Sequence, residues 1–275
     1  MWLRRTAPHC LAVCALMNLG GTANAQTAPE NHARIELIAE EKALQAGRPL
    51  WVGLWFQMDE GWHVYWKNSG DSGEPPKVQW ILPAGFQAGA IQWPLPVRLG
   101  RGTVVDYGYE NQVLLMAPIT VPSDAKSSGV SAIVSDVRYL VCREICIPGK
   151  ARLTLSIPVG DAASARFIKW QKLFRRTRLQ LPKSAPATWK ISAKSEKDQF
   201  VLSVAGAGAA KNVSFFPLEP GVIENSAPQT VMASGTGFRV TLKKSEQLDK
   251  PISALKGVIA LGDGRAFEIS ALVAQ

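Results

Sequence analysis

Apolar and polar residues alternate along most of the chain in short runs, which glycine, proline, asparagine and aspartate separate. Alternation with a period of two predicts β-strands that have one buried and one exposed face. Before residue 160 the predicted strands cover 35–40, 50–58, 62–67, 78–82, 113–121, 130–139 and 151–157. Short strands at even spacing are typical of a sandwich or barrel, so we expect an all-β domain over 26–158.

The period changes between residues 161 and 181. Apolar side chains recur here at intervals of three, four and seven residues, at Phe167, Trp170, Phe174 and Leu181. This spacing predicts one amphipathic helix, with Asp161 available as its cap. The polar face is basic and carries Arg166, Lys169, Lys172, Arg175, Arg176 and Arg178. We expect this face to be solvated while the apolar stripe docks onto a neighbouring domain; the alternative is contact with an anionic membrane surface.

Strand-like runs resume after this helical linker, which we place at 159–186. They cover 189–193, 200–204, 213–216, 237–242, 257–261 and 266–273. The pattern predicts a second, sandwich-like β-domain over 187–275. That domain contains neither cysteine nor histidine, so it is poorly equipped for nucleophilic or general-base chemistry. By elimination we assign it a structural or partner-binding role.

The first 25 residues have the pattern of a cleavable signal peptide. Arg4 and Arg5 precede an apolar stretch over 11–19, and the small residues of Ala23-Asn24-Ala25 place the mature start at Gln26. We therefore expect an exported, soluble, periplasmic protein. Removing this leader lowers the formal net charge from +9 to +7. The excess is modest and lacks a basic stripe interleaved with stacking aromatics, so we do not expect a nucleic-acid partner.

Loss of the leader removes Cys10 and Cys14 and leaves Cys142 and Cys146 as the only thiols. Residues four apart on one straight strand lie roughly 13 Å apart, well beyond the ~5.5 Å that a disulfide needs between Cα atoms. A tight hairpin loop would place them opposite each other at about 4.5 to 5.5 Å. So short a loop adds little as a staple and suits exchange, but the spacing alone leaves redox exchange and an inert staple equally open.

Metal binding is the other chemistry that a thiol pair offers. Two thiolates suit Cu(I), with Met58 or Met116 as further ligands, but neither methionine is a sequence neighbour of the cysteines. A structural zinc site normally needs four Cys or His ligands, and only His32 and His63 are left to complete one. We therefore expect no metal and no other cofactor.

A series of longer motifs resembles one known family. In chain order they read GWHVYWKN at 61–68, GDSG at 70–73, PP at 75–76, Trp80, LP at 82–83, GF at 85–86, QWP at 92–94, Pro96, YGYE at 107–110, LVC at 140–142 and CIPG at 146–149. The series resembles the N-terminal periplasmic domain of DsbD-type thiol:disulfide interchange proteins, especially the ScsB-like branch. The stretch FFPLEPGVIE at 215–224 resembles the region that follows this domain in ScsB-like proteins.

The resemblance implies an immunoglobulin-like sandwich with a redox-active cysteine pair. Cys142 and Cys146 align with that pair, and Cys146 would form the mixed disulfide with partners. The family shields its disulfide with a loop, which corresponds here to 98–106, where Gly100 and Gly102 would permit movement. Tyr65, Tyr107 and Tyr109 are candidates to line the cysteine pocket, although strand aromatics more often fill a core. The loop acids Asp71 and Glu74 are candidates to tune a thiol pKa.

The resemblance also implies partners. In this family the domain takes electrons from a membrane-embedded thiol reductant transporter and passes them to thioredoxin-like periplasmic proteins. The membrane-spanning and C-terminal thioredoxin-like domains that usually follow are absent from this sequence, so we expect it to borrow a reductant, to serve as a soluble relay, or to have been repurposed. The leading hypothesis is a thiol-disulfide oxidoreductase, a protein-disulfide reductase-like relay. The alternative is a non-enzymatic binding module with a structural disulfide, in copper or envelope stress handling.

Overall fold

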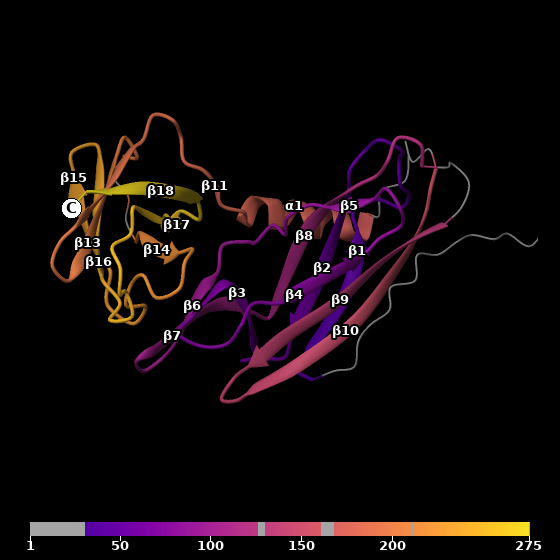
Figure 1. Ribbon diagram of the computed structural model, residues 1–275, viewed down its shortest axis with the longest axis horizontal. Helices are drawn as coiled ribbons and strands as arrows, with labels where there is room; N and C mark the ends of the chain where they lie inside the picture. Colours follow the sequence, from indigo (N-terminus) through magenta and orange to yellow (C-terminus); the bar gives the residue numbers. More distant parts are fainter. Residues whose placement is uncertain (1–30, 126–129, 161–167, 209, 211, 275) are drawn as a thin grey trace, which may run out of the picture.

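The computed structural model describes residues 31–125, 130–160, 168–208, 210 and 212–274. The signal peptide expected over 1–25, and the helical positions Asp161, Arg166 and Phe167, lie outside these residues. Two β-rich lobes joined through helix α1 (Ile168–Gln180) make up the described chain (Figure 1). No helix within the described residues combines the length and hydropathy needed to cross a membrane.

The N-terminal lobe consists of two antiparallel sheets. The first sheet has the order β1 (Ala33–Ala39), β2 (Leu50–Met58), β8 (Gln112–Thr120) and β5 (Gln87–Ala88). The second has the order β10 (Cys146–Pro158), β9 (Val130–Cys142), β3 (His63–Gly70), β7 (Val104–Glu110) and β6 (Val97–Arg101), with β4 (Lys77–Ile81) also paired to β9. This arrangement confirms the predicted immunoglobulin-like all-β sandwich.

The sandwich is held together by apolar side chains that both sheets direct inward. Phe56 of β2 lies edge-on to Tyr139 of β9, with ring centroids 5.7 Å apart, and Leu153 of β10 is fully buried in the same cluster. Alternation fixes which residues take part, because successive side chains of a strand point to opposite faces. A shift of one residue would therefore expose the whole apolar set of a strand, which pins the register.

Helix α1 covers the outer face of the first sheet. Phe174 is fully buried against Ile38, Leu114 and Met116. Arg178 closes the contact with a two-pronged ion pair to Glu40, at 2.7 and 2.5 Å. The basic side chains on the opposite face are exposed, namely Lys169, Lys172, Arg175 and Arg176. The apolar stripe of the helix thus docks onto the neighbouring domain, as its spacing predicted.

The C-terminal lobe is built on one curled sheet with its own apolar core. Its order is β14 (Ser214–Pro217), β17 (Ala254–Ala260), β18 (Ala266–Ala274), β12 (Lys190–Ser195), β13 (Gln199–Ala205), β16 (Gly237–Lys243) and β15 (Thr230–Ser234), and β11 (Lys183–Ser184) also pairs with β18. Strand β18 runs parallel to β11 and β12 and antiparallel to β17.

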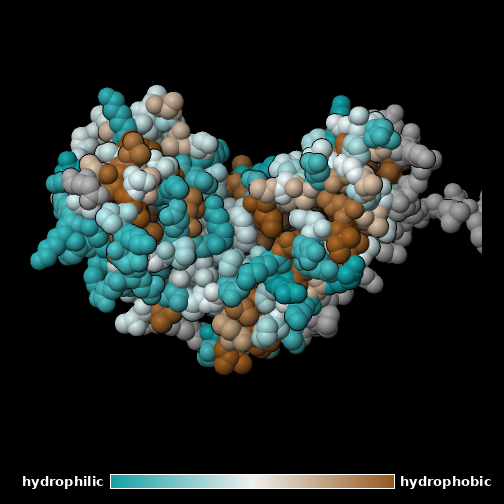
Figure 2. All heavy atoms as spheres, viewed as in Figure 1, coloured by the Kyte–Doolittle hydropathy of each residue, from teal (hydrophilic) through white to brown (hydrophobic). Residues whose placement is uncertain are grey.

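The two lobes share an apolar contact. Phe216 of β14 is buried in the N-terminal core, where its ring lies 5.4 Å from that of Tyr107 and 6.3 Å from that of Trp66. Lys67 also reaches Glu268 at 3.6 Å across the boundary. Figure 2 shows the notch that separates the lobes on one side, and hydrophilic side chains along the outer edge of the C-terminal lobe.

The sequence pattern missed the strands around residue 100. Strands β6 and β7 form a hairpin over 97–110, where only a shielding loop and a tyrosine motif were expected. Glycine at 100 and 102 is typical of a loop, which is why no strand was predicted here. Gly100 nevertheless lies within β6, and of the two glycines only Gly102 has a positive φ, of 65°. Strand β9 likewise continues to Cys142, three residues beyond its predicted end.

Candidate redox site at the β9–β10 turn

The two cysteines stand opposite each other at the closed end of the β9–β10 hairpin. Cys142 is the last residue of β9, Cys146 is the first of β10, and the register pairs them directly. Their Cα atoms are 4.2 Å apart and their sulfurs form a disulfide. The three residues between them make the turn, which is the tight hairpin loop that brings residues four apart within disulfide distance.

The two sulfurs belong to residues that differ sharply in exposure. Cys142 is 1% exposed, because it lies on β9 beside His63 of the central strand β3. Cys146 is exposed, since β10 is at the edge of the sheet order. Cys146 is therefore the more accessible of the two to an incoming thiolate.

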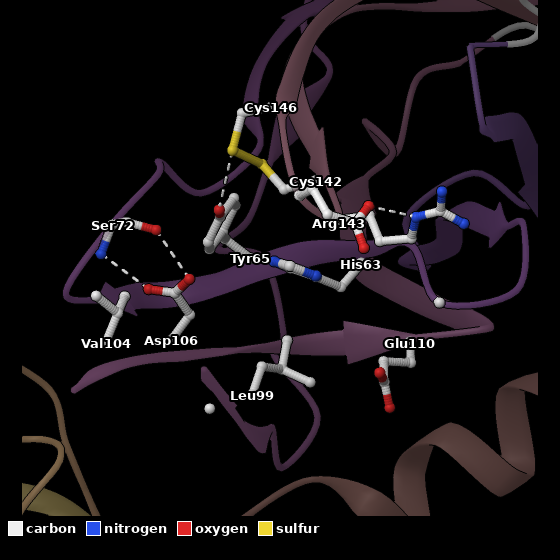
Figure 3. A pocket seen from close by; sticks show the side chains of 13 residues that line it. His63, Tyr65, Ser72, Leu99, Val104, Asp106, Glu110, Cys142, Arg143 and Cys146 are labelled. Carbon is white, nitrogen blue, oxygen red and sulfur yellow. Dashed lines mark hydrogen bonds and ion pairs between the residues drawn. A yellow bond between two sulfur atoms is a disulfide. The ribbon is translucent and has the colours of Figure 1, made fainter. Parts of the chain in front are cut away.

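A cavity of about 480 Å³ adjoins the disulfide on the outer face of this sheet. Figure 3 shows the side chains that line it, with the disulfide above and the β6–β7 hairpin below. The lining residues are Gly61, His63, Tyr65, Ser72, Leu99, Gly100, Val104, Asp106, Glu110, Cys142, Arg143, Glu144 and Cys146. The hairpin thus supplies Leu99 and Val104 to the wall opposite the cysteines, and Gly100 also lines the cavity.

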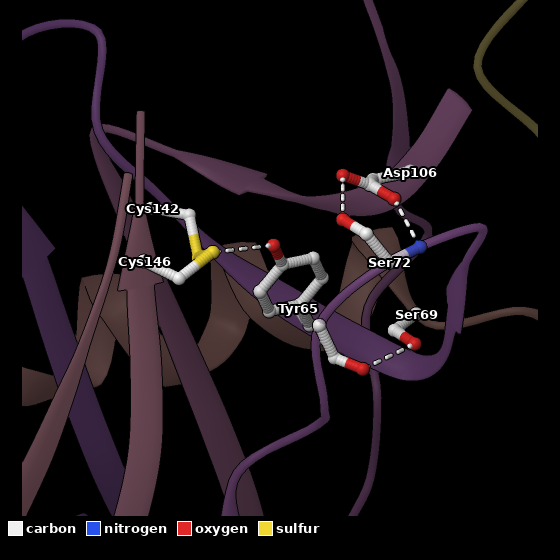
Figure 4. Close-up of a disulfide and its surroundings, with 7 residues drawn as sticks. Tyr65, Ser69, Ser72, Asp106, Cys142 and Cys146 are labelled. Atoms are coloured by element: carbon white, nitrogen blue, oxygen red, sulfur yellow. Dashed lines mark hydrogen bonds between the residues drawn. A yellow bond between two sulfur atoms is a disulfide. The ribbon is translucent and has the colours of Figure 1, made fainter. Parts of the chain in front are cut away.

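Tyr65 contacts the exposed cysteine directly. Its hydroxyl lies 3.4 Å from Cys146 Sγ, and it must be the donor because a disulfide sulfur carries no proton (Figure 4). Burial raises the pKa of this phenol, and the Asp106 carboxylate raises it further, while a hydrogen bond with Ser72 works in the opposite direction. The hydroxyl therefore keeps its proton at neutral pH.

The other two tyrosine candidates lie elsewhere. Tyr107 and Tyr109 point into the core, where the Tyr107 hydroxyl donates to Asn225 Oδ1 at 2.8 Å and the Tyr109 hydroxyl donates to the Pro94 carbonyl at 2.7 Å. Burial raises the pKa of both phenols. Alternation explains the placement, since Asp106 and Glu110 occupy the cavity-facing positions of the same strand. Only Tyr65 of the three lines the cavity.

Neither loop acid proposed from the sequence lines the cavity. Asp71 accepts hydrogen bonds from the Val105 amide and Asn225 Nδ2, both at 2.7 Å, and Glu74 pairs with Lys77. The carboxylate that does line it is Asp106, which accepts from the amide and hydroxyl of Ser72 at 2.8 Å each. Alternation along residues 104–110 places Asp106 on the face opposite Tyr107 and Tyr109, so the strand pattern alone could have identified it.

The described residues contain no cluster of three or more His, Cys, Asp or Glu side chains arranged to hold a metal ion. The thioether candidates are buried in the first sheet, Met58 at the end of β2 and Met116 under helix α1. His32 bonds Asp59 at 2.8 Å and stacks on Trp62. Only His63 of these candidates lines the cavity beside the cysteines.

Residues 34–158 match the family described as thiol:disulfide interchange protein DsbD, N-terminal. These residues form a DsbD-type N-terminal domain. The chain also matches the crystal structure of the N-terminal periplasmic domain of ScsB from Proteus mirabilis, with a TM-score of 0.67 over 91% of this chain and 97% of that chain. The identity is 17%, so this second match shows a shared fold. Among curated protein sequences, none matches the chain.

The match confirms the family suggested by the sequence motifs. The DsbD-type domain contains the whole β9–β10 hairpin with both cysteines, and it also contains Tyr65 of β3. The ScsB match extends beyond this domain and includes most of the C-terminal lobe, because it covers nearly all of both chains. The two-lobed architecture therefore belongs to the shared fold.

Proposed function

We propose that this protein is a periplasmic thiol-disulfide exchange protein, an oxidoreductase that relays electrons through Cys142 and Cys146. The observation that carries the proposal is the asymmetry of the pair. One cysteine is exposed at a sheet edge beside a hydroxyl donor, and the other is buried. That arrangement separates an attacking sulfur from a resolving one, as exchange requires.

Reduction of the bridge proceeds in two balanced steps. A partner thiolate attacks Cys146 Sγ, the disulfide breaks, and its electron pair leaves on Cys142 as a thiolate that then takes up a proton. The partner's second thiolate attacks the partner sulfur of the mixed disulfide and releases Cys146 as a thiolate. The partner leaves as a disulfide, and the pair has gained two electrons. In the reverse direction Cys146 attacks a partner disulfide and Cys142 resolves the mixed disulfide.

Tyr65 stabilises the charged form of Cys146 in both directions. Its protonated hydroxyl is already 3.4 Å from the sulfur that becomes a thiolate. A hydrogen bond to an ionised sulfur is stronger than one to a neutral sulfur and favours the ionised state. Arg143 contributes little net charge, because it is paired with Glu144 at 2.6 Å.

The membership of residues 34–158 in the DsbD-type family supports two kinds of partner. Thioredoxin-like periplasmic proteins would exchange with Cys146, and a membrane-embedded thiol reductant transporter would renew the dithiol. The β6–β7 hairpin would limit access to the cavity by bulkier oxidants, because it forms the wall opposite the cysteines. We further propose the division 26–158, 159–186 and 187–275 for the redox domain, the linker and the second β-domain.

The test uses single-cysteine variants of the chain in which Cys10 and Cys14 are serine. A thioredoxin-like domain with one active-site cysteine, activated as its thionitrobenzoate disulfide, is mixed with Cys142→Ser or Cys146→Ser. We expect Cys142→Ser to form the mixed disulfide at least roughly tenfold faster, measured by released thionitrobenzoate. Equal rates, or no adduct with either variant, would refute the proposed roles.

A further inference from the structure

One residue of the C-terminal lobe makes several polar contacts with the redox domain. Asn225 lies between β14 and β15 and is 5% exposed. Its side chain accepts from the Tyr107 hydroxyl at 2.8 Å and donates to Asp71 Oδ1 at 2.7 Å. Its carbonyl accepts from the Arg98 guanidinium. Asn225 therefore binds strand β7, strand β6 and the loop after β3 at once.

The contact with Asp71 holds the loop over residues 70–73 in place. The other oxygen of the Asp71 carboxylate accepts from the Val105 amide, and the Asp71 amide donates to the Val105 carbonyl at 3.1 Å. The next residue, Ser72, donates twice to Asp106. Asn225 thus adds a further hydrogen bond, to Asp71, in a loop that already bonds β7 through Asp71 and Ser72. This bond reduces the conformational freedom of the loop.

That loop supports the tyrosine beside Cys146. Gly73 lies against the Tyr65 ring so closely that a Cβ at this position would come within 2.1 Å of Tyr65 Cζ, the carbon that bears the hydroxyl. The Gly73 carbonyl is held in turn by the Ser69 hydroxyl at 3.2 Å (Figure 4). The position of the Tyr65 hydroxyl is therefore set by the loop that Asn225 binds.

We propose that Asn225 is a positioning residue, through which the C-terminal lobe holds Tyr65 against Cys146 and so sets the reactivity of that sulfur. The inference rests on the proposed exchange at Cys146. It assigns the second lobe a part in the redox chemistry, although none of the described residues of that lobe lines the cavity. Asn225 suits the task because a buried amide binds a donor and an acceptor in fixed directions, which an apolar contact does not.

The experiment measures alkylation of the reduced chain by iodoacetamide as a function of pH, with Cys10 and Cys14 replaced by serine. Peptide mass spectrometry assigns the modified residue, and we expect Cys146, because Cys142 is buried. Asn225→Ala is compared with the parent chain. Asp71→Ala removes the acceptor of the same link and serves if the first variant fails to fold.

We expect Asn225→Ala to move the midpoint of alkylation to higher pH and to slow the reaction at pH 7 by about threefold, because a displaced hydroxyl stabilises the thiolate less. Tyr65→Phe should slow it by at least as much. Adding Asn225→Ala to Tyr65→Phe should then cause no further change, since the two act through one contact. Phe216→Leu loosens the apolar part of the same interface and serves as the matched control.

Three results would overturn the inference: an unchanged midpoint in both link variants, an equal shift in Phe216→Leu, or a full additional shift when Asn225→Ala is added to Tyr65→Phe. A purely structural Asn225 would lower the melting temperature without moving the midpoint. Failure of the proposed function looks different, because Cys142→Ser would then form no mixed disulfide with the thioredoxin-like domain, whichever residue stands at position 225.

Discussion

At the scale of single residues, the site depends on a glycine as much as on its cysteines. Gly73 has a φ of +66°, which disfavours any other residue, and its missing side chain makes room for the Tyr65 ring. The tyrosine in turn places a protonated hydroxyl on the exposed sulfur. The chemistry of Cys146 is thus coupled to the backbone of a neighbouring loop.

Gly73→Ala tests this coupling. The new methyl group must push the Tyr65 ring away, so we expect about 1 kcal/mol or more of lost stability, together with slower alkylation of reduced Cys146. Gly235→Ala is the matched control, because Gly235 also has a positive φ, of 55°, and its added Cβ would meet nothing within 4 Å. Slower alkylation in the control as well would contradict the role of Tyr65.

At the scale of elements, the β9–β10 hairpin that ends in the cysteine pair also carries a row of positively charged side chains across neighbouring strands. The register places Arg138 directly between Lys77 of β4 and Lys150 of β10. One row further along, Asp136 pairs with Arg152 at 3.1 Å. Like charges directly opposite each other destabilise a sheet, whereas opposite charges stabilise it.

Arg138→Glu should therefore stabilise the protein. A carboxylate between two lysines replaces two repulsions by two attractions, worth roughly 0.2 to 1 kcal/mol each, and should raise the midpoint of urea unfolding. Arg152→Glu should do the reverse, because it places two carboxylates opposite each other. An unchanged midpoint for Arg138→Glu would show that these charges are too well solvated to interact, and a lower midpoint would contradict the expected attraction.

Elements are also where prediction from the sequence succeeded and failed. Period-two alternation located β2 and β8 almost to the residue, because a buried face forces a regular pattern. It missed β6 and β7, whose glycines imitate a loop, and it said nothing of the cavity between distant strands. Backbone distances pointed to the hairpin geometry of the cysteines, because one straight strand would hold them too far apart for a disulfide. The contacts of Asn225 could not be predicted, because a residue 154 positions from Asp71 leaves no local signal.

At the scale of the whole molecule, the sandwich keeps several phenols out of water. Burial raises the pKa of Tyr65, Tyr107, Tyr109 and Tyr139 above the ordinary value of 10.0. Unfolding exposes each phenol to water and returns its pKa to about that ordinary value. The folded state therefore binds more protons than the unfolded state as the pH rises past about 10, and its stability falls with pH there.

We expect the free energy of unfolding to be constant with respect to these phenols below about pH 9 and to fall steeply between about pH 10 and 11. Tyr109→Phe should weaken this dependence, because Tyr109 is deeply buried, with no group besides the Pro94 carbonyl bonded to its hydroxyl in the described chain. Urea unfolding at a series of pH values measures both curves. Curves of equal slope would show that Tyr109 does not contribute.

The central claim is that the Cys142–Cys146 bridge exchanges electrons, and its reduction potential tests this most directly. The chain with Cys10 and Cys14 replaced by serine is equilibrated in graded glutathione buffers, and its free thiols are then alkylated and counted by mass. The account predicts a potential within the range of exchange proteins, about −120 to −230 mV. A potential below about −300 mV would mark the bridge as a structural staple and contradict the account.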